Sequence, residues 1–135
     1  MSNETNATEL SVYEMMSKAN AAFEAKDYAT ALPLYEKAAE QGDATAQFNL
    51  GIMYENGKGI AQDYSRACDW YEKAAEQGDA YAQNNLGIMY ENGDGVAQDY
   101  DKAREWYEKA AENGCEEAKQ VLSDWENKGA NNSKA

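Results

Sequence analysis

A block of 36 residues occurs twice in succession, and this repetition constrains the fold more than any other feature of the sequence. The first copy runs from Asp43 to Gly78 and the second from Asp79 to Gly114. Aligned without gaps, the two copies differ at nine positions and are identical at the other 27. A fixed period of this length is typical of a chain in which each unit buries its apolar face against its neighbours. We therefore expect a linear stack of similar units.

Each copy has the pattern of two helices joined by a glycine-rich loop. In the first copy, apolar residues recur at positions 46, 50, 53 and 54, the spacing of one face of an α-helix. The segment 56–59 (NGKG) interrupts this pattern, and a second helical face follows Asp63. Asp43 and Asp63 are favourable N-cap residues, and Gly78 suits the end of the second helix. Each copy is therefore predicted to be an antiparallel helical hairpin.

Two glycines lie inside the predicted first helices, where glycine costs about 1 kcal/mol relative to alanine. We expect Gly51 and Gly87 to be required by a close approach of the paired helix, under the ring of Tyr71 or Tyr107. The tryptophan that precedes each of these tyrosines is expected to pack between neighbouring hairpins. The structural signature of the two copies is thus Leu50, Gly51, Tyr54, Trp70 and Tyr71, followed by Leu86, Gly87, Tyr90, Trp106 and Tyr107.

The charge balance of the chain restricts its partners. Among 135 residues, 25 are acidic and 12 are basic, which gives a net charge of −13. This imbalance argues against binding to nucleic acid and to anionic membrane surfaces. It favours basic partners, or it serves only to keep the protein soluble. The sequence has no run of 18 apolar residues, so we expect no membrane span.

The residue types that most enzymes use are scarce in this chain. It has no histidine, which removes the usual general base and the commonest metal ligand. Two cysteines are too few for a disulfide framework or a zinc site. Cys115 stands where the other repeats have an N-cap aspartate, and we interpret it as a weak cap rather than a reactive thiol. We therefore expect no catalytic site, no metal and no cofactor.

The features that bear on localisation favour a cytoplasmic protein. The N-terminal residues lack the basic and apolar regions of a secretory signal, and two cysteines suit a reducing compartment. A secreted or periplasmic location stays open if the N-terminus has been trimmed.

The repeated residues resemble the Sel1-like repeat, a branch of the tetratricopeptide superfamily. The resemblance implies a right-handed α–α superhelix, or solenoid, of antiparallel helical hairpins. The second copy carries the same residues 36 positions later. In the first copy the pattern consists of Ala46, Leu50, Gly51, Tyr54, Gly57, Gly59, Asp63, Ala67, Trp70, Tyr71, Lys73, Ala74, Ala75 and Gly78.

The flanking segments resemble the same superfamily more loosely. Residues 9–42 are similar to a plain tetratricopeptide hairpin, with a loop five residues shorter than that of the repeats. In residues 115–127, Ala118 and Leu122 keep the spacing of Ala46 and Leu50, which predicts a single capping helix. The prediction is therefore an all-α chain of about seven helices, with repeats at 43–78 and 79–114 and disordered tails at 1–8 and 128–135.

The family resemblance also implies a function. Sel1-like proteins serve as non-catalytic scaffolds or adaptors, and in tetratricopeptide-like solenoids the first helix of each hairpin lines a concave groove. Two of the nine differences between the copies fall at groove positions, as recognition of a non-repetitive ligand would require. The predicted groove residues are Glu14, Ser17, Ala21 and Glu24 in the first hairpin, Thr45, Phe48, Ile52 and Glu55 in the first repeat, and Tyr81, Asn84, Ile88 and Glu91 in the second.

These residues combine aromatic groups with carboxylates. We therefore expect a monomer whose partner is a protein or an extended peptide, with Lys or Arg and an apolar anchor. One alternative is an engineered or structural solenoid without a ligand of its own. Another is an enzyme that interacts with β-lactams, as some cysteine-rich Sel1-like proteins do. It is disfavoured because this chain lacks regular cysteine pairs and an S-x-x-K motif.

Overall fold

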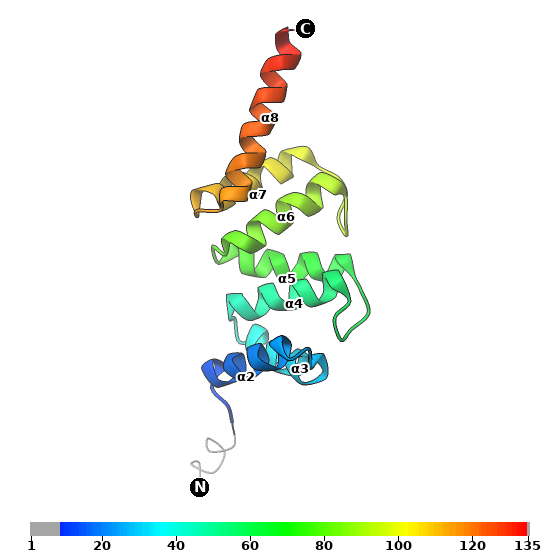
Figure 1. The fold of residues 1–135 in the computed structure, drawn as a ribbon, viewed down its shortest axis with the longest axis vertical. Helices are drawn as coiled ribbons and strands as arrows, with labels where there is room; N and C mark the ends of the chain where they lie inside the picture. Colours follow the sequence, from blue (N-terminus) through cyan, green and yellow to red (C-terminus); the bar gives the residue numbers. More distant parts are fainter. Residues whose placement is uncertain (1–8, 135) are drawn as a thin grey trace.

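The computed structural model describes the backbone of residues 9–134 and the side chains of residues 9–129. These residues form seven α-helices and no strands, which confirms the predicted all-α solenoid (Figure 1). The predicted tail at residues 1–8 lies outside the described residues. The helices are α2 (Val12–Glu24), α3 (Tyr28–Glu40), α4 (Ala44–Asn56), α5 (Tyr64–Glu76), α6 (Ala80–Asn92), α7 (Tyr100–Glu112) and α8 (Glu116–Lys134).

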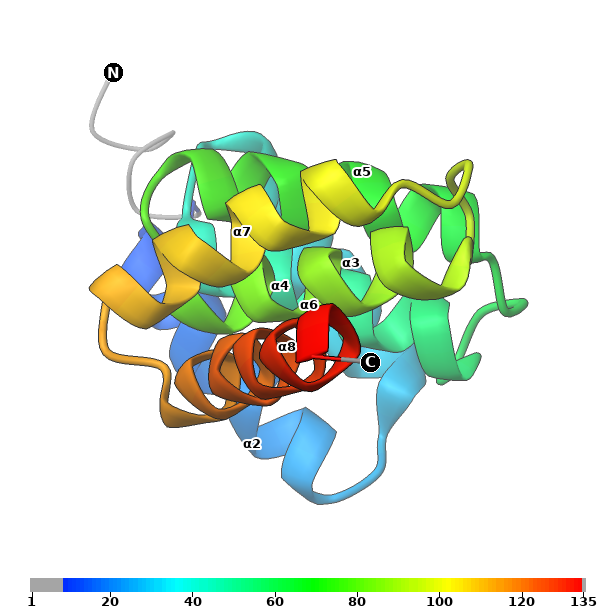
Figure 2. The same cartoon turned by 90° about the horizontal axis from the view of Figure 1, so that it is seen from above.

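The helices are stacked in chain order along the longest axis of the molecule. Helices α2 and α3, α4 and α5, and α6 and α7 form three hairpins, and the second helix of each hairpin packs on the first helix of the next unit. Seen from above, α5 and α7 lie on one side of the stack, and α6 and α8 lie on the other (Figure 2). The first and second helices of the hairpins therefore form two separate layers.

Aspartates fix where five of the helices begin. Each accepts a hydrogen bond from the backbone N–H three residues later, which satisfies one of the donors that the first helical turn leaves free. These N-caps are Asp27, Asp43, Asp63, Asp79 and Asp99. Helix α2 begins instead with a capping box between Ser11 and Glu14.

The core of each hairpin is a tyrosine from its second helix. Tyr35, Tyr71 and Tyr107 are each 1% exposed or less. A Cβ atom added to Gly51 would overlap the ring of Tyr71, and one added to Gly87 would lie 2.7 Å from two ring carbons of Tyr107. The predicted close approach of the paired helices is thus confirmed in both repeats.

Consecutive units are joined on two sides. The loop of each repeat lies against the start of the second helix in the preceding hairpin. Gly59 contacts Tyr28 in this way, and Gly95 contacts the backbone of Tyr64. Trp70 packs against the apolar clusters on both sides of it, as the sequence predicted for a residue between hairpins.

The last helix closes the C-terminal end of the stack. Ala118 is fully buried, and Val121, Leu122 and Trp125 pack with it against α7. Helix α8 then continues to Lys134 and rises beyond the other helices (Figure 1). The sequence had predicted a capping helix that ends at residue 127, with a tail from 128. Its polar C-terminal residues gave no apolar period from which this extension could have been predicted.

Candidate functional site

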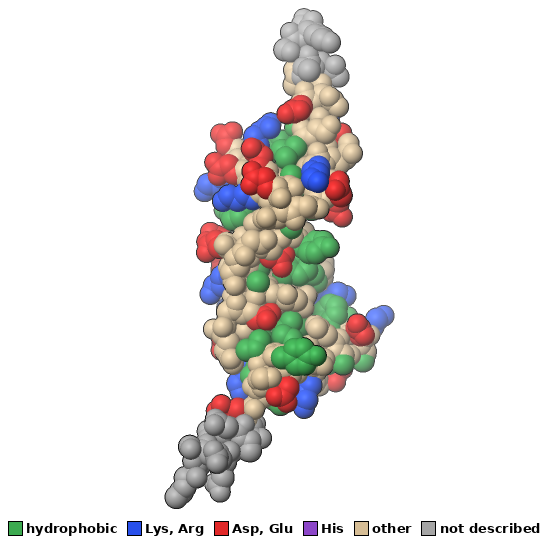
Figure 3. Space-filling view, turned by 90° about the vertical axis from the view of Figure 1, so that its left-hand side faces the viewer, with side chains coloured by type: hydrophobic (Ala, Val, Ile, Leu, Met, Phe, Trp, Pro, Cys, Tyr) green, Lys and Arg blue, Asp and Glu red, His purple; other side chains and the backbone are tan. Residues whose placement is uncertain are grey.

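The predicted groove residues lie on the first helices of the three hairpins, α2, α4 and α6. In the second repeat Tyr81 is 70% exposed and Ile88 is 41% exposed, whereas Phe48 and Ile52 in the first repeat are half-buried. Figure 3 shows the side of the stack where the turns between hairpins lie. Hydrophobic side chains gather there at mid-height and near the N-terminal end, with acidic side chains among them. Several apolar groups on this layer are therefore open to solvent.

Phe48 is in contact with one buried and one exposed aromatic ring. The centroid of its ring lies 5.7 Å from that of Tyr71, which belongs to the core. The centroid of the Tyr81 ring, which belongs to the second repeat, lies 6.0 Å from the centroid of the Phe48 ring. The three rings thus connect the interior of the first repeat to an exposed aromatic surface shared by α4 and α6.

Asn84 occupies the same place in the second repeat as Phe48 in the first. Its side chain is only 4% exposed, and its Nδ2 lies 3.4 Å from Oε2 of Glu117 on α8. Its Oδ1 is buried and has no hydrogen-bond partner among the described residues. A buried hydrogen-bond acceptor without a donor destabilises the folded state by roughly 1–3 kcal/mol. The sequence predicted that Asn84 would face the groove, but it gave no sign of this burial.

The two contacts form one series. Phe48 meets Tyr81, and Asn84 meets Glu117, and each pair is related to the other by the 36-residue period. We call these four residues the inner row. It is aromatic between α4 and α6, and it is polar and acidic between α6 and α8. Glu117 was missed in the sequence analysis, although counting one period on from Tyr81 would have found it.

Two carboxylates lie on the same helices as the inner row, two turns after Phe48 on α4 and after Asn84 on α6. The hydroxyl of Tyr71 donates to Oε1 of Glu55 at 2.6 Å, and that of Tyr107 donates to Oε1 of Glu91 at 2.7 Å. Burial, followed by these hydrogen bonds, raises the pKa of both tyrosines. The two glutamates are half-buried, so each core tyrosine holds a negative charge in a fixed position at the surface.

The first hairpin departs from this arrangement. Asn20 stands where the repeats have Gly51 and Gly87, and its Oδ1 accepts the hydroxyl of Tyr35 at 2.6 Å. Burial is the main cause that raises the pKa of Tyr35 to about 12, and the charge of Glu24 adds to it.

The remaining predicted groove residues have unremarkable surroundings. Ser17, Ala21, Glu24 and Thr45 are exposed, and Glu14 is engaged in the capping box of α2. Tyr13, which the sequence analysis did not select, is 83% exposed one turn before Ser17. No periodic signal marked it, because the repeats have alanine at that position.

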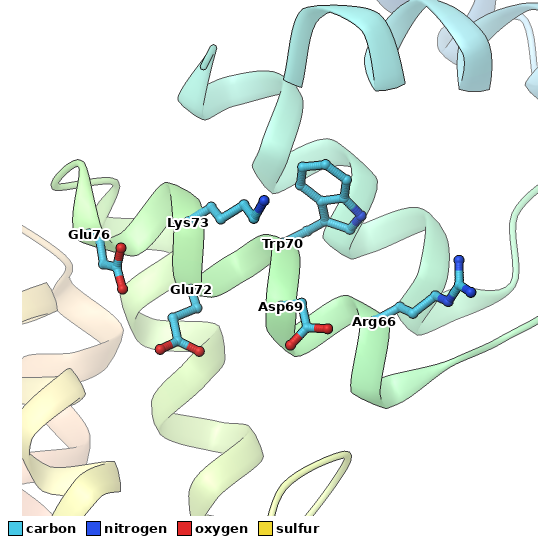
Figure 4. Close-up of a pocket in the computed structure, with 6 residues that line it drawn as sticks. All are labelled: Arg66, Asp69, Trp70, Glu72, Lys73 and Glu76. Carbon is cyan, nitrogen blue, oxygen red and sulfur yellow. The ribbon is translucent and has the colours of Figure 1, made fainter. Parts of the chain in front are cut away.

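The opposite layer presents a different kind of surface. Arg66, Asp69, Glu72, Lys73 and Glu76 surround Trp70 along α5, and Figure 4 shows Lys73 extended beside the tryptophan while the acidic groups point the other way. Nζ of Lys73 lies 4.9 Å from the centroid of the Trp70 ring.

The second repeat has the same pair, with Lys109 4.6 Å from the ring of Trp106. Because both repeats carry the arrangement, it is a feature of the scaffold.

The cysteines differ in their surroundings. Cys68 is 3% exposed, and its Sγ lies 3.4 Å from the carbonyl oxygen of Asp94 and from Sδ of Met89. Burial raises the pKa of its thiol to about 12. Cys115 is half-buried at the turn before α8, and both thiols are free. Cys68 is therefore a core residue that helps to hold the loop of the next repeat.

The described residues contain no group of three or more His, Cys, Asp or Glu side chains that could hold a metal ion. No described helix is both long and apolar enough to cross a membrane.

The sequence matches the Sel1 repeat family at residues 22–43, 44–79 and 80–115. The chain belongs to the Sel1 repeat family. The second and third matches begin one residue after the predicted repeats at 43–78 and 79–114, at the first residues of α4 and α6. The first match covers most of the N-terminal hairpin, for which the sequence had suggested only a looser tetratricopeptide resemblance. No curated protein matches the chain.

Solved structures show the same fold. A Sel1 repeat protein from Oxalobacter formigenes is 39% identical, with a TM-score of 0.81, and the match covers 90% of this chain and 95% of that protein. A protective antigen of uropathogenic Escherichia coli with an SLR fold is 33% identical, with a TM-score of 0.70. That match covers 86% of this chain but only 28% of the antigen.

Cysteine-rich protein B of Helicobacter pylori has the same fold at lower identity. It is 24% identical with a TM-score of 0.67, and the match covers 82% of this chain and 93% of that protein. Sel1 repeats commonly mediate protein–protein interactions, and proteins of this type are generally non-catalytic scaffolds.

Proposed function

We propose that this Sel1 repeat protein is a non-catalytic adaptor that holds an extended segment of a partner protein against the layer formed by α2, α4 and α6. The observation that carries the proposal is the aromatic pair of the half-buried Phe48 and the exposed Tyr81; Ile88, also exposed, lies two turns after Tyr81 on α6. Exposed aromatic groups held by a rigid scaffold are the side chains that contribute most to protein interfaces.

The fixed carboxylates support a basic partner. Glu55 and Glu91 are positioned by the core tyrosines, and they stand on a protein with a net charge of −13. Carboxylates in fixed positions attract Lys and Arg side chains and set the register of a bound peptide. The proposed ligand is therefore a peptide with an apolar anchor and at least one basic residue.

The test is a selection of random peptides displayed on phage, with binding measured by fluorescence anisotropy. The variant Phe48→Asn/Tyr81→Thr exchanges each aromatic residue for the one at the same place in the other repeat, so it uses residues that this hairpin already accommodates. We expect selected peptides to contain an apolar residue, and this variant to weaken their binding by about tenfold or more.

The matched control is Tyr100→Thr, which removes an aromatic ring that is 59% exposed on the second layer. It should leave peptide binding unchanged. Equal binding to the wild type and to the Phe48→Asn/Tyr81→Thr variant would place the binding surface elsewhere. A selection that enriches no peptide would overturn the adaptor function proposed here.

A further inference from the structure

We propose that the inner row recognises two side chains of one peptide: an apolar residue packed on the exposed side of the Phe48–Tyr81 ring pair, and a Lys or Arg beside Glu117 and Asn84. This inference rests on the proposed function and specifies the ligand of the same surface. It follows from the change in chemistry along the inner row, where an aromatic pair is replaced by an amide and a carboxylate one repeat later.

The buried amide of Asn84 is the first reason to place a cation at the second pair. Its Oδ1 has no hydrogen-bond partner among the described residues, while its Nδ2 is directed to Glu117. An ammonium or guanidinium group carries several donors and no acceptor, so it can satisfy both the amide oxygen and the carboxylate. Because Oδ1 is buried, a cation reaches it only after a movement of the side chains around it; Tyr81, one turn before Asn84 on α6, is 70% exposed.

The charge of Glu117 is the second reason. The two salt bridges of the described residues join Arg66 to Asp63 and Lys119 to Glu116, so neither involves Glu117. Tyr81, Glu116 and Glu117 line a cavity of about 320 Å³ at the turn between α7 and α8. This cavity offers space for a basic side chain beside a carboxylate that no cation of the described chain neutralises.

The repeat spacing sets the distance between the two recognised residues. The helices that pack directly on one another are consecutive, as α4 on α5 and α5 on α6, so α4 and α6 are separated by one repeat rather than by one helix contact. An extended peptide advances about 3.3 Å per residue. The aromatic pair lies between α4 and α6, and the acidic pair lies between α6 and α8. A peptide that follows the stack should therefore carry its basic residue at one fixed number of positions from its apolar residue.

The experiment uses fluorescein-labelled nine-residue peptides with a central leucine in a serine and alanine background. A single lysine is placed in turn at one to four positions on either side, and anisotropy reports binding to the full chain. We expect the tightest binding at one lysine position on one side of the leucine, and clearly weaker binding at the other positions. Replacing that lysine by norleucine, or Glu117 by lysine, should weaken binding by about tenfold.

Two variants make the assignment specific. Glu126→Lys is the control, because Glu126 is exposed on the same helix and nine residues, or half a turn in projection, from Glu117. It should not change which peptide binds best. The double variant Asn84→Phe/Glu117→Tyr gives the second pair aromatic residues like those of the first, and it should prefer a second leucine to lysine. Circular dichroism melts confirm that each variant is folded.

The outcomes separate the two proposals. Binding that depends on Phe48 and Tyr81 but not on Glu117 or on the lysine position would overturn this inference and leave the adaptor function standing. Binding that Glu117→Lys and Glu126→Lys weaken equally would also overturn it, because a general charge effect would then suffice. If no peptide binds, and the phage selection also fails, the adaptor function itself falls.

Discussion

Repeat 1 (residues 43–78) and repeat 2 (residues 79–114) are nearly the same hairpin in different surroundings. Repeat 1 lies between two hairpins, whereas repeat 2 is followed by the single helix α8. Cys68 in repeat 1 is buried under Met89 and Asp94 of the next repeat. Arg104, at the same place in repeat 2, is exposed and lies 5.3 Å from the centroid of the Trp125 ring. One position is thus core or surface according to what the next unit covers.

A second difference between the copies lies at the end of the second helix, where Gln77 of repeat 1 corresponds to Asn113 of repeat 2. Gln77 donates to the carbonyl oxygen of Gly42 and to the side chain of Gln47. The shorter Asn113, one period later, donates to the side chain of Gln83. Both side-chain pairs lie inside their own repeat, and the longer Gln77 also reaches back to Gly42, the residue before repeat 1.

The largest change in stability is expected from exchanging Cys68 and Arg104, which occupy the same place in the two repeats. We expect Cys68→Arg to lower the free energy of unfolding by about 3–5 kcal/mol, because it forces a charge into a buried position. Arg104→Cys should change the free energy of unfolding by less than about 1 kcal/mol, since its site is exposed. Urea unfolding followed by circular dichroism measures both, and equal losses would show that the next repeat does not set the difference.

Substituting the helical glycines tests whether the two repeats share one core geometry. Gly51→Ala should lower the free energy of unfolding by about 2 kcal/mol, because the added methyl group meets the buried ring of Tyr71. Gly87→Ala should cost less, since its added Cβ would lie slightly further from Tyr107. Gly129→Ala is the control, because nothing lies within 4 Å of a Cβ at that position. A neutral Gly51→Ala variant would contradict this packing.

Alkaline pH should act on the hairpin cores and leave the protein unaffected near neutrality. Burial raises the pKa of Tyr35 from its ordinary value of 10.0 to about 12, and that of Tyr71 and Tyr107 in the same direction. Because the unfolded chain ionises first, the stability is fully present below pH 10.0 and falls as the pH rises towards 12.

The measurement is thermal unfolding between pH 9 and pH 12, with tyrosinate absorbance at 295 nm. Tyr71→Phe and Tyr107→Phe should each cost roughly 1 kcal/mol at neutral pH and reduce the sensitivity to alkali by similar amounts. A melting temperature that stays constant over this pH range would show that the buried tyrosines ionise as easily in the folded protein as in the unfolded chain.

Most of the scaffold could be predicted from particular residues. The spacing of Leu50, Tyr54 and Tyr71 identified the helical faces, the aspartates marked where the helices begin, and Gly51 indicated a close approach. These signals are local or repeat with a fixed period, so they can be read from a single sequence.

The details of the candidate site could not be predicted in the same way. The 36-residue period points to Glu117 as the counterpart of Tyr81, but the contact of Asn84 with Glu117, 33 positions away, and the burial of Asn84 depend on how α6 and α8 are placed. The anchoring of Glu55 by Tyr71 likewise depends on how two helices are turned towards each other.

The sequence by itself determined the family, the hairpins and their order, because each repeat carries its own helix signals and must bury the same apolar face. Only the tertiary structure decided which of two equivalent positions is covered, as for Cys68 and Arg104, and which charges remain available at the surface. The physical reason is that burial in a solenoid is completed by the neighbouring unit, so the surroundings of a residue depend on the next repeat as much as on its own.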